Sequence, residues 1–196
     1  MTVFLDIIGS WVIRAALIAI MLTLTINLSN VLYQSSMQAN TNGYLAAVDS
    51  AIYVDVSAAG YSGPSVSSFN RSNTFKSVSS QSLYFYADVV SAGGVDSIYY
   101  YTSYSSATKL YTLYRQLNNS TALPLGNNFS NITFKYYNAK GDSLSSPYTP
   151  YSNIKSVRVM LTAQYVLKNA FVNTKGLADS TCYVSIDRRI SPPNLL

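Results

Sequence analysis

Residues 3–33 read VFLDIIGSWVIRAALIAIMLTLTINLSNVLY, a run that is apolar almost throughout. The part from Ile7 to Leu28 supplies the roughly 20 residues that a membrane-spanning helix needs. No basic segment precedes the run and no small-x-small cleavage site follows it, so we expect it to stay on the protein. We therefore predict a hydrophobic transmembrane helix over residues 1–33.

Two charged residues interrupt this run, Asp6 and Arg14. Charges inside a membrane helix are costly and are usually paired or functional. The two are eight positions apart, so they share a helix face but are too far apart to touch within one straight helix. Either each side chain extends to the nearest membrane interface, or Asp6 meets a positive group on a staggered neighbouring helix. In that second interpretation, Gly9 and Ser10 offer a small surface for close helix packing.

The helical pattern continues beyond Tyr33 with a different surface. We predict an amphipathic continuation over residues 34–60 that ends near Ala59–Gly60, because Gly60, Gly63 and Pro64 follow closely. Its apolar positions recur at helical spacing: Tyr44, Leu45, Val48, Ile52 and Val56.

Residues 61–196 change to β-rich patterns. We expect a long loop over Tyr61–Ser80, and turns at Ala92–Gly94, Gly126–Asn128 and Ala139–Asp142. About six strands are predicted: Ser82–Val90, Val95–Tyr104, Lys109–Leu117, Asn131–Tyr137, Ile154–Leu167 and Thr181–Ile190. One long helix followed by these strands predicts an α+β fold, with an antiparallel sheet packed on the second half of the helix.

The composition excludes several classes of function. Only 11% of the residues are charged, all eight acidic residues are Asp, and there is no His. The single cysteine, Cys182, cannot form an internal disulfide, and His-dependent triads and the common transition-metal sites have no ligands to use. The 13 Lys and Arg residues are scattered, whereas nucleic-acid binding needs clustered charge. We expect no enzyme, no catalytic residue, no metal or other cofactor, and no nucleic-acid partner.

Polar residues suggest two further features. The 18 tyrosines are interpreted as core and cross-strand packing rather than an electron path. Six Asn-x-Ser/Thr sequons occur, of which Asn27 lies in the predicted helix and is expected to be unmodified. The possible glycosylation sites are Asn70, Asn118, Asn119, Asn128 and Asn131.

The order of several segments resembles the type IV pilin and pseudopilin superfamily, most closely the larger minor pilins and the J-type pseudopilins. The segments that carry the resemblance are Asp55 followed by Ala59-Gly60-Tyr61, Leu83–Asp88 followed by Gly94–Tyr100, Leu113-Tyr114-Arg115, Phe134–Tyr137 followed by Gly141 and Ile154–Val159, and Val184–Arg189. The sequence shows no prepilin leader, and Asp6 stands near the place of the family's Glu at the fifth mature position. Removal of Met1 before the small residue Thr2 would make Asp6 the fifth residue.

The resemblance implies a structural subunit of an extracellular filament that polymerises through its N-terminal helix. Asp6 would pair with the N-terminal amine of the neighbouring subunit, with Arg14 as an additional or replacement partner. The partners would be copies of the same chain, inner-membrane assembly machinery, and lipid before assembly. Before assembly the chain would cross the cytoplasmic membrane once, with its N-terminus in the cytoplasm.

Two alternatives to a main filament subunit stay open. One is a minor pilin or pseudopilin of a pilus or secretion machine. The other is a single-pass membrane protein whose β-rich head binds a ligand and never polymerises.

Overall fold

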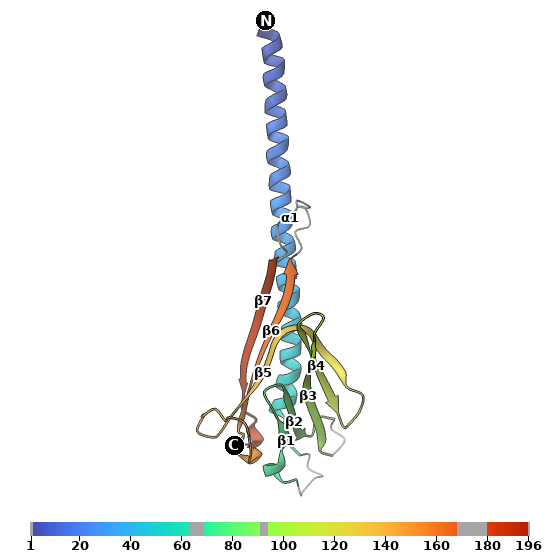
Figure 1. The fold of residues 1–196 in the computed structure, drawn as a ribbon, viewed down its shortest axis with the longest axis vertical. Coiled ribbons are helices and arrows are strands. Elements are labelled where there is room, and N and C mark those ends of the chain that lie inside the picture. Colours follow the sequence, from blue (N-terminus) through green and yellow to red (C-terminus); the bar gives the residue numbers. More distant parts are fainter. Residues whose placement is uncertain (1, 63–68, 91–93, 168–179, 196) are drawn as a thin grey trace. The chain divides into compact units, whose positions relative to one another are not determined.

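The computed structural model describes residues 2–62, 69–90, 94–167 and 180–195. Within these ranges it contains one long helix, α1 (Thr2–Ser57), and one seven-stranded antiparallel sheet (Figure 1). This confirms the predicted α+β class. The chain divides into two units, residues 1–40 with 166–182 and residues 41–165 with 183–196, so α1 contributes to both.

The helix ends where the sequence predicts. After Ser57 a turn forms in which the Ala59 amide donates to the Val56 carbonyl (3.0 Å) and the Tyr61 amide donates to the Ala58 carbonyl (2.9 Å). Gly60 adopts a φ of +77°, a left-handed conformation that suits glycine after a helix. Its amide donates to the Tyr86 carbonyl in the sheet (3.0 Å). The chain therefore leaves the helix already hydrogen-bonded to the sheet.

The strands follow one another across the sheet in chain order, each next to its sequence neighbour. They are β1 (Phe75–Val78), β2 (Ser82–Ala87), β3 (Asp96–Ser105), β4 (Leu110–Leu117), β5 (Leu123–Tyr137), β6 (Ser156–Leu167) and β7 (Ser180–Ile190). Three short 3₁₀ helices accompany them, η1 (Arg71–Asn73), η2 (Tyr151–Asn153) and η3 (Pro193–Leu195).

The core lies between the sheet and the Thr41–Ser57 part of α1. The helix buries Leu45, Val48, Ile52 and Val56, as the predicted amphipathic stripe requires. In β2, alternate residues are buried, in keeping with the period of two along a strand. Fully buried sheet residues that complete the core include Leu83, Phe85, Ile98, Leu113, Phe129, Ile132, Phe134 and Leu161.

Two sequence predictions are wrong. The expected loop over Tyr61–Ser80 contains η1 and strand β1, which the pattern hides because a register irregularity between Phe75 and Ser77 breaks the alternation. The expected turn at Gly126–Asn128 lies inside β5, where register shifts against β4 mark an irregular, bulged stretch. There, Asn128 has a φ of +62°. The residue types that form turns also occur in β-bulges, so composition alone did not distinguish a bulge from a turn here.

Tyrosines on the sheet pack across strands, in agreement with the interpretation of the sequence. Five of them form a row over β2, β3 and β4, in the order Tyr86, Tyr84, Tyr99, Tyr101 and Tyr114. Successive ring centroids lie 5.1–5.8 Å apart. At these separations the rings contact one another and tie the three strands together.

Candidate functional site

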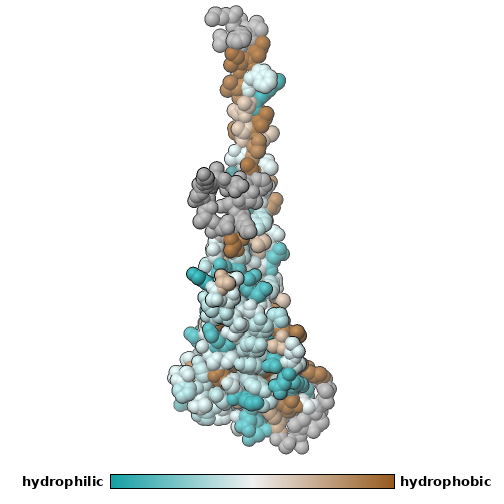
Figure 2. All heavy atoms as spheres, turned by 45° about the vertical axis from the view of Figure 1, so that its right-hand side comes forward, coloured by the Kyte–Doolittle hydropathy of each residue, from teal (hydrophilic) through white to brown (hydrophobic). Residues whose placement is uncertain are grey.

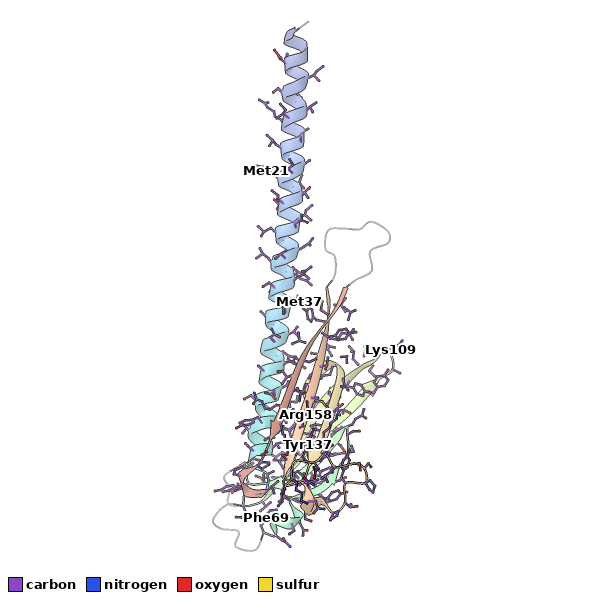
Figure 3. All side chains as sticks on the ribbon, turned by 90° about the vertical axis from the view of Figure 1, so that its left-hand side faces the viewer. Met21, Met37, Phe69, Lys109, Tyr137 and Arg158 are labelled. Atoms are coloured by element: carbon purple, nitrogen blue, oxygen red, sulfur yellow. The ribbon has the colours of Figure 1, made fainter. Side chains whose placement is uncertain are left out.

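The α1 residues of the first unit expose their apolar side chains. Fifteen large apolar residues between Ile7 and Tyr33 are 43–70% exposed, and Figure 2 shows brown, apolar atoms gathered there. Side chains project from the helix on all sides around Met21 (Figure 3). Among the described residues, α1 is the one helix long and apolar enough to cross a membrane.

The four residues predicted for assembly share one face of α1. Asp6, Gly9, Ser10 and Arg14 line one open groove with Ile13. Within the described part of the chain, neither Asp6 nor Arg14 makes a hydrogen bond or ion pair. At 1.5 Å per residue, their eight-residue separation corresponds to about 12 Å along the helix. The two charges therefore stand at opposite ends of the groove without reaching each other.

The middle of this groove leaves room for another helix to approach closely. A Cβ built on Gly9 meets nothing within 4 Å, and Ser10 has a small side chain. Small residues on a helix face let another helix backbone come near. Chemically, the groove offers a carboxylate at one end, a guanidinium at the other and a small surface between them.

An ion pair in the second unit attaches α1 to the sheet. The Arg115 guanidinium on β4 donates to both carboxylate oxygens of Asp55, with Nε 2.6 Å from Oδ2 and Nη2 3.1 Å from Oδ1. The Tyr100 hydroxyl on β3 donates to the same Oδ2 (2.5 Å). Burial and the adjacent Asp55 carboxylate raise the pKa of Tyr100, and the hydrogen bond to Asp55 raises the pKa of Arg115. One carboxylate therefore joins the helix to two strands.

Two further ion pairs involve β7. Arg188 lies 2.9 Å from the buried carboxylate of Asp49 on α1, and its guanidinium stands over the Tyr53 ring at 5.1 Å. Arg158 on β6 donates through Nε to Asp187 (2.7 Å). The hydrogen bond from Arg158 lowers the pKa of Asp187. The last strand is thus connected by charge to both the helix and its neighbour in the sheet.

Tyr44 links α1 to the irregular stretch of β5 by hydrogen bonds. Its hydroxyl donates to the Asn127 carbonyl (3.1 Å) and accepts from the Asn127 amide. Burial raises the pKa of Tyr44, although its bond to the Asn127 backbone acts in the opposite direction. The helix side chain thereby satisfies backbone groups at a point where strand pairing is irregular.

The five candidate glycosylation residues Asn70, Asn118, Asn119, Asn128 and Asn131 are all exposed. Their side chains differ in what they already bind. The Asn118 amide nitrogen donates to Asp96 (2.5 Å), and its oxygen accepts from the Ser97 amide (2.8 Å). A glycan on Asn118 would have to fit around these bonds. Asn119, next along the chain, has no such bond to Asp96 or Ser97.

Asp96 is the centre of that small network. Besides Asn118, it accepts from the amides of Val89 and Val90, each at 3.0 Å. Burial acts to raise the pKa of Asp96, but the hydrogen bonds from Asn118, Val89 and Val90 outweigh it, and the pKa is lowered. The carboxylate holds the start of β3 to the segment that follows β2.

The sequence analysis proposed four candidate assembly residues but did not pair Asp55 with Arg115 or Asp49 with Arg188. A signal was present, because Asp49 and Asp55 adjoin Val48 and Val56 in the apolar stripe. A carboxylate at the edge of a buried face needs a partner. No family model, curated protein or solved structure matches the chain. The long helix with an antiparallel sheet is compatible with a pilin-like fold.

Proposed function

We propose that this chain is a structural subunit of an extracellular, pilus-like filament that polymerises through the first half of α1. Before assembly that half lies in the cytoplasmic membrane as a single span, with the N-terminus in the cytoplasm. The β-rich head lies outside and presents the candidate glycosylation sites. Assembly machinery in the same membrane moves the subunit into the fibre.

The observation that carries the proposal is the exposed apolar surface of α1 together with two charges, Asp6 and Arg14, that have no partner among the described residues. Exposed apolar patches of this extent mark contact with lipid or with other protein. Lipid alone accounts for the apolar side chains, whereas a carboxylate and a guanidinium in the same segment are costly in lipid unless they are paired or reach the interface. Contact with other copies accounts for both.

Charge complementarity favours a parallel, staggered arrangement. A neighbouring copy displaced by eight residues, about 12 Å, would place its Asp6 beside Arg14 of the first. Leaving either charge unpaired in an apolar bundle costs several kcal/mol, so the pair would act mainly to fix the register. Packing of the apolar side chains would supply most of the association energy.

Exchanging the two charges tests this arrangement. In Asp6→Arg and in Arg14→Asp, two like charges would meet at each contact, so we expect no fibres and retention of the subunit in the membrane. The chain that carries both substitutions should form fibres again, because opposite charges face each other at the same stagger.

Electron microscopy of sheared cell-surface material provides the readout, with Lys109→Asp as the control for a charge change on the head. Fibres of normal abundance from both single variants would contradict the pairing. A double variant that stays in the membrane would contradict the eight-residue stagger.

A further inference from the structure

Three segments of the head enclose a small cavity of about 140 Å³. They are η1 with the start of β1, η2 with the two residues after it, and η3. Phe75 and Ile154 are buried and contribute its apolar part. The polar lining includes Arg71, Lys155 and the hydroxyls of Ser72 and Ser152.

The backbone around this cavity is fixed by hydrogen bonds. The Ser72 amide donates to the Asn70 side chain (3.0 Å), and Thr74 donates through both its amide and its hydroxyl to the Arg71 carbonyl. The Lys155 amide donates to the Tyr137 carbonyl of β5 (2.8 Å). The cavity is therefore a preformed feature of the head, as small-molecule sites usually are.

The charge in this cavity is unbalanced. No carboxylate is found among its described lining residues. Neither Arg71 nor Lys155 forms an ion pair within the described chain, whereas Arg115, Arg158 and Arg188 each do. Two cations at one small cavity repel each other unless an anion joins them. The site favours a carboxylate or sulfate, which an Arg and a Lys can both hydrogen-bond.

A second cavity of about 340 Å³ adjoins the first and shares Ser152 and Lys155 with it. Its lining adds the amides of Asn138 and Asn153. Lys140 and Asp142 line it as well and offset each other's charge. The Asn138 oxygen accepts from the amides of both Lys140 and Asp142 (2.9 Å each), which fixes this wall. The second cavity is thus polar but close to neutral.

We propose that the two cavities form one binding site for an acidic oligosaccharide. A sugar bearing one anionic group occupies the first cavity, with the anion between Arg71 and Lys155 and its hydroxyl groups near Ser72 and Ser152. A neutral neighbouring sugar occupies the second cavity, where Asn153 bonds its hydroxyls and Asn138, held by Lys140 and Asp142, forms the wall. The site is on the head and does not depend on polymerisation.

Binding of a hyaluronan tetrasaccharide, which alternates acidic and neutral sugars, tests the proposal. The full chain in detergent micelles would be titrated by calorimetry with this probe and with its neutral methyl ester. We expect binding of the acid, at least about tenfold weaker binding of the ester, and a similar loss when Arg71→Gln is combined with Lys155→Gln. Lys109→Gln, a surface change that lines neither cavity (Figure 3), should bind like the wild type.

The thermal transition of the double variant should match that of the wild type, and Arg71→Lys with intact Lys155 should keep most of the affinity. Equal affinity for acid and ester would overturn the proposal, as would full binding by the double variant or no heat of binding at about 1 mM probe. A single-stranded oligonucleotide that binds more tightly than the tetrasaccharide would also overturn it. Asp6→Ala should bind the sugar normally, which separates this site from filament assembly.

Discussion

At the residue scale, the Asp55 carboxylate accepts hydrogen bonds from two side chains at once. It receives Arg115 from β4 and Tyr100 from β3 while it stands on α1. The Asp55 side chain is 8% exposed and that of Arg115 is 28% exposed, so the pair is largely removed from water. A pair of this kind contributes less by its own attraction than by the cost of leaving one member alone.

Replacing Asp55 by Asn should therefore destabilise the head. The isosteric amide leaves Arg115 without its counter-charge, and we expect the free energy of unfolding to fall by about 2–3 kcal/mol, less than for a fully buried pair. Chemical unfolding of the full chain in detergent, followed by tyrosine fluorescence, provides the measurement. The matched control is Asp142→Asn on an exposed turn, for which a change below about 0.5 kcal/mol is expected. Equal effects of the two substitutions would show that the Asp55 network adds no stability.

Asp96 makes the stability of the head depend on pH. Because its folded pKa is lowered, its contribution is fully present above the unfolded value of about 3.9 and is lost as pH falls through the folded value. As pH falls below about 4, the wild type should lose more unfolding free energy than Asp96→Asn. Unfolding curves at several pH values test this, and parallel pH profiles for the two proteins would contradict the role of Asp96.

At the element scale, α1 and β5 come into close contact at Gly126. A Cβ on Gly126 would run into the Tyr44 hydroxyl and lie 2.7 Å from the Phe129 ring. Tyr44 and Phe129 in turn stack with centroids 6.0 Å apart. Only glycine lets the irregular stretch of β5 come this near to the helix.

Two glycine substitutions should have opposite effects on the stability of the head. Gly126→Ala should destabilise the head by about 1–3 kcal/mol, because the added methyl group has no room. Gly43→Ala, at a helix position where a Cβ meets nothing within 4 Å, should stabilise it by about 0.5–1 kcal/mol. Thermal unfolding of both variants measures the difference, and shifts of the same sign would contradict this description of the contact.

The sequence predicted the elements that follow a clear period and missed those that do not. The end of the helix shortly before Gly60 and the buried stripe from Leu45 to Val56 were found because helix caps and helical spacing are local signals. Strand β1 was missed because its register is irregular, and Gly126–Asn128 was read as a turn because bulges use the same residues. Pairing of Asp55 with Arg115 depends on tertiary contacts between residues far apart in the chain, which no local pattern encodes.

At the scale of the whole molecule, the two units have surfaces suited to different surroundings. The first presents fifteen large apolar side chains and two charges along one helix. The second has its own core and ion pairs, and a row of tyrosines lies across three of its strands. This difference is the basis of the proposal that the chain lies first in a membrane and then in a bundle of identical helices, with the head outside in both states.

Imaging of sheared cell-surface fibres with an antibody against the head tests polymerisation most directly. The proposal predicts uniform fibres labelled along their whole length in cells that make the wild type, and none in cells that make Asp6→Ala, whose subunit stays in the membrane fraction. Label found in the membrane alone for the wild type, or normal labelled fibres from Asp6→Ala, would contradict it.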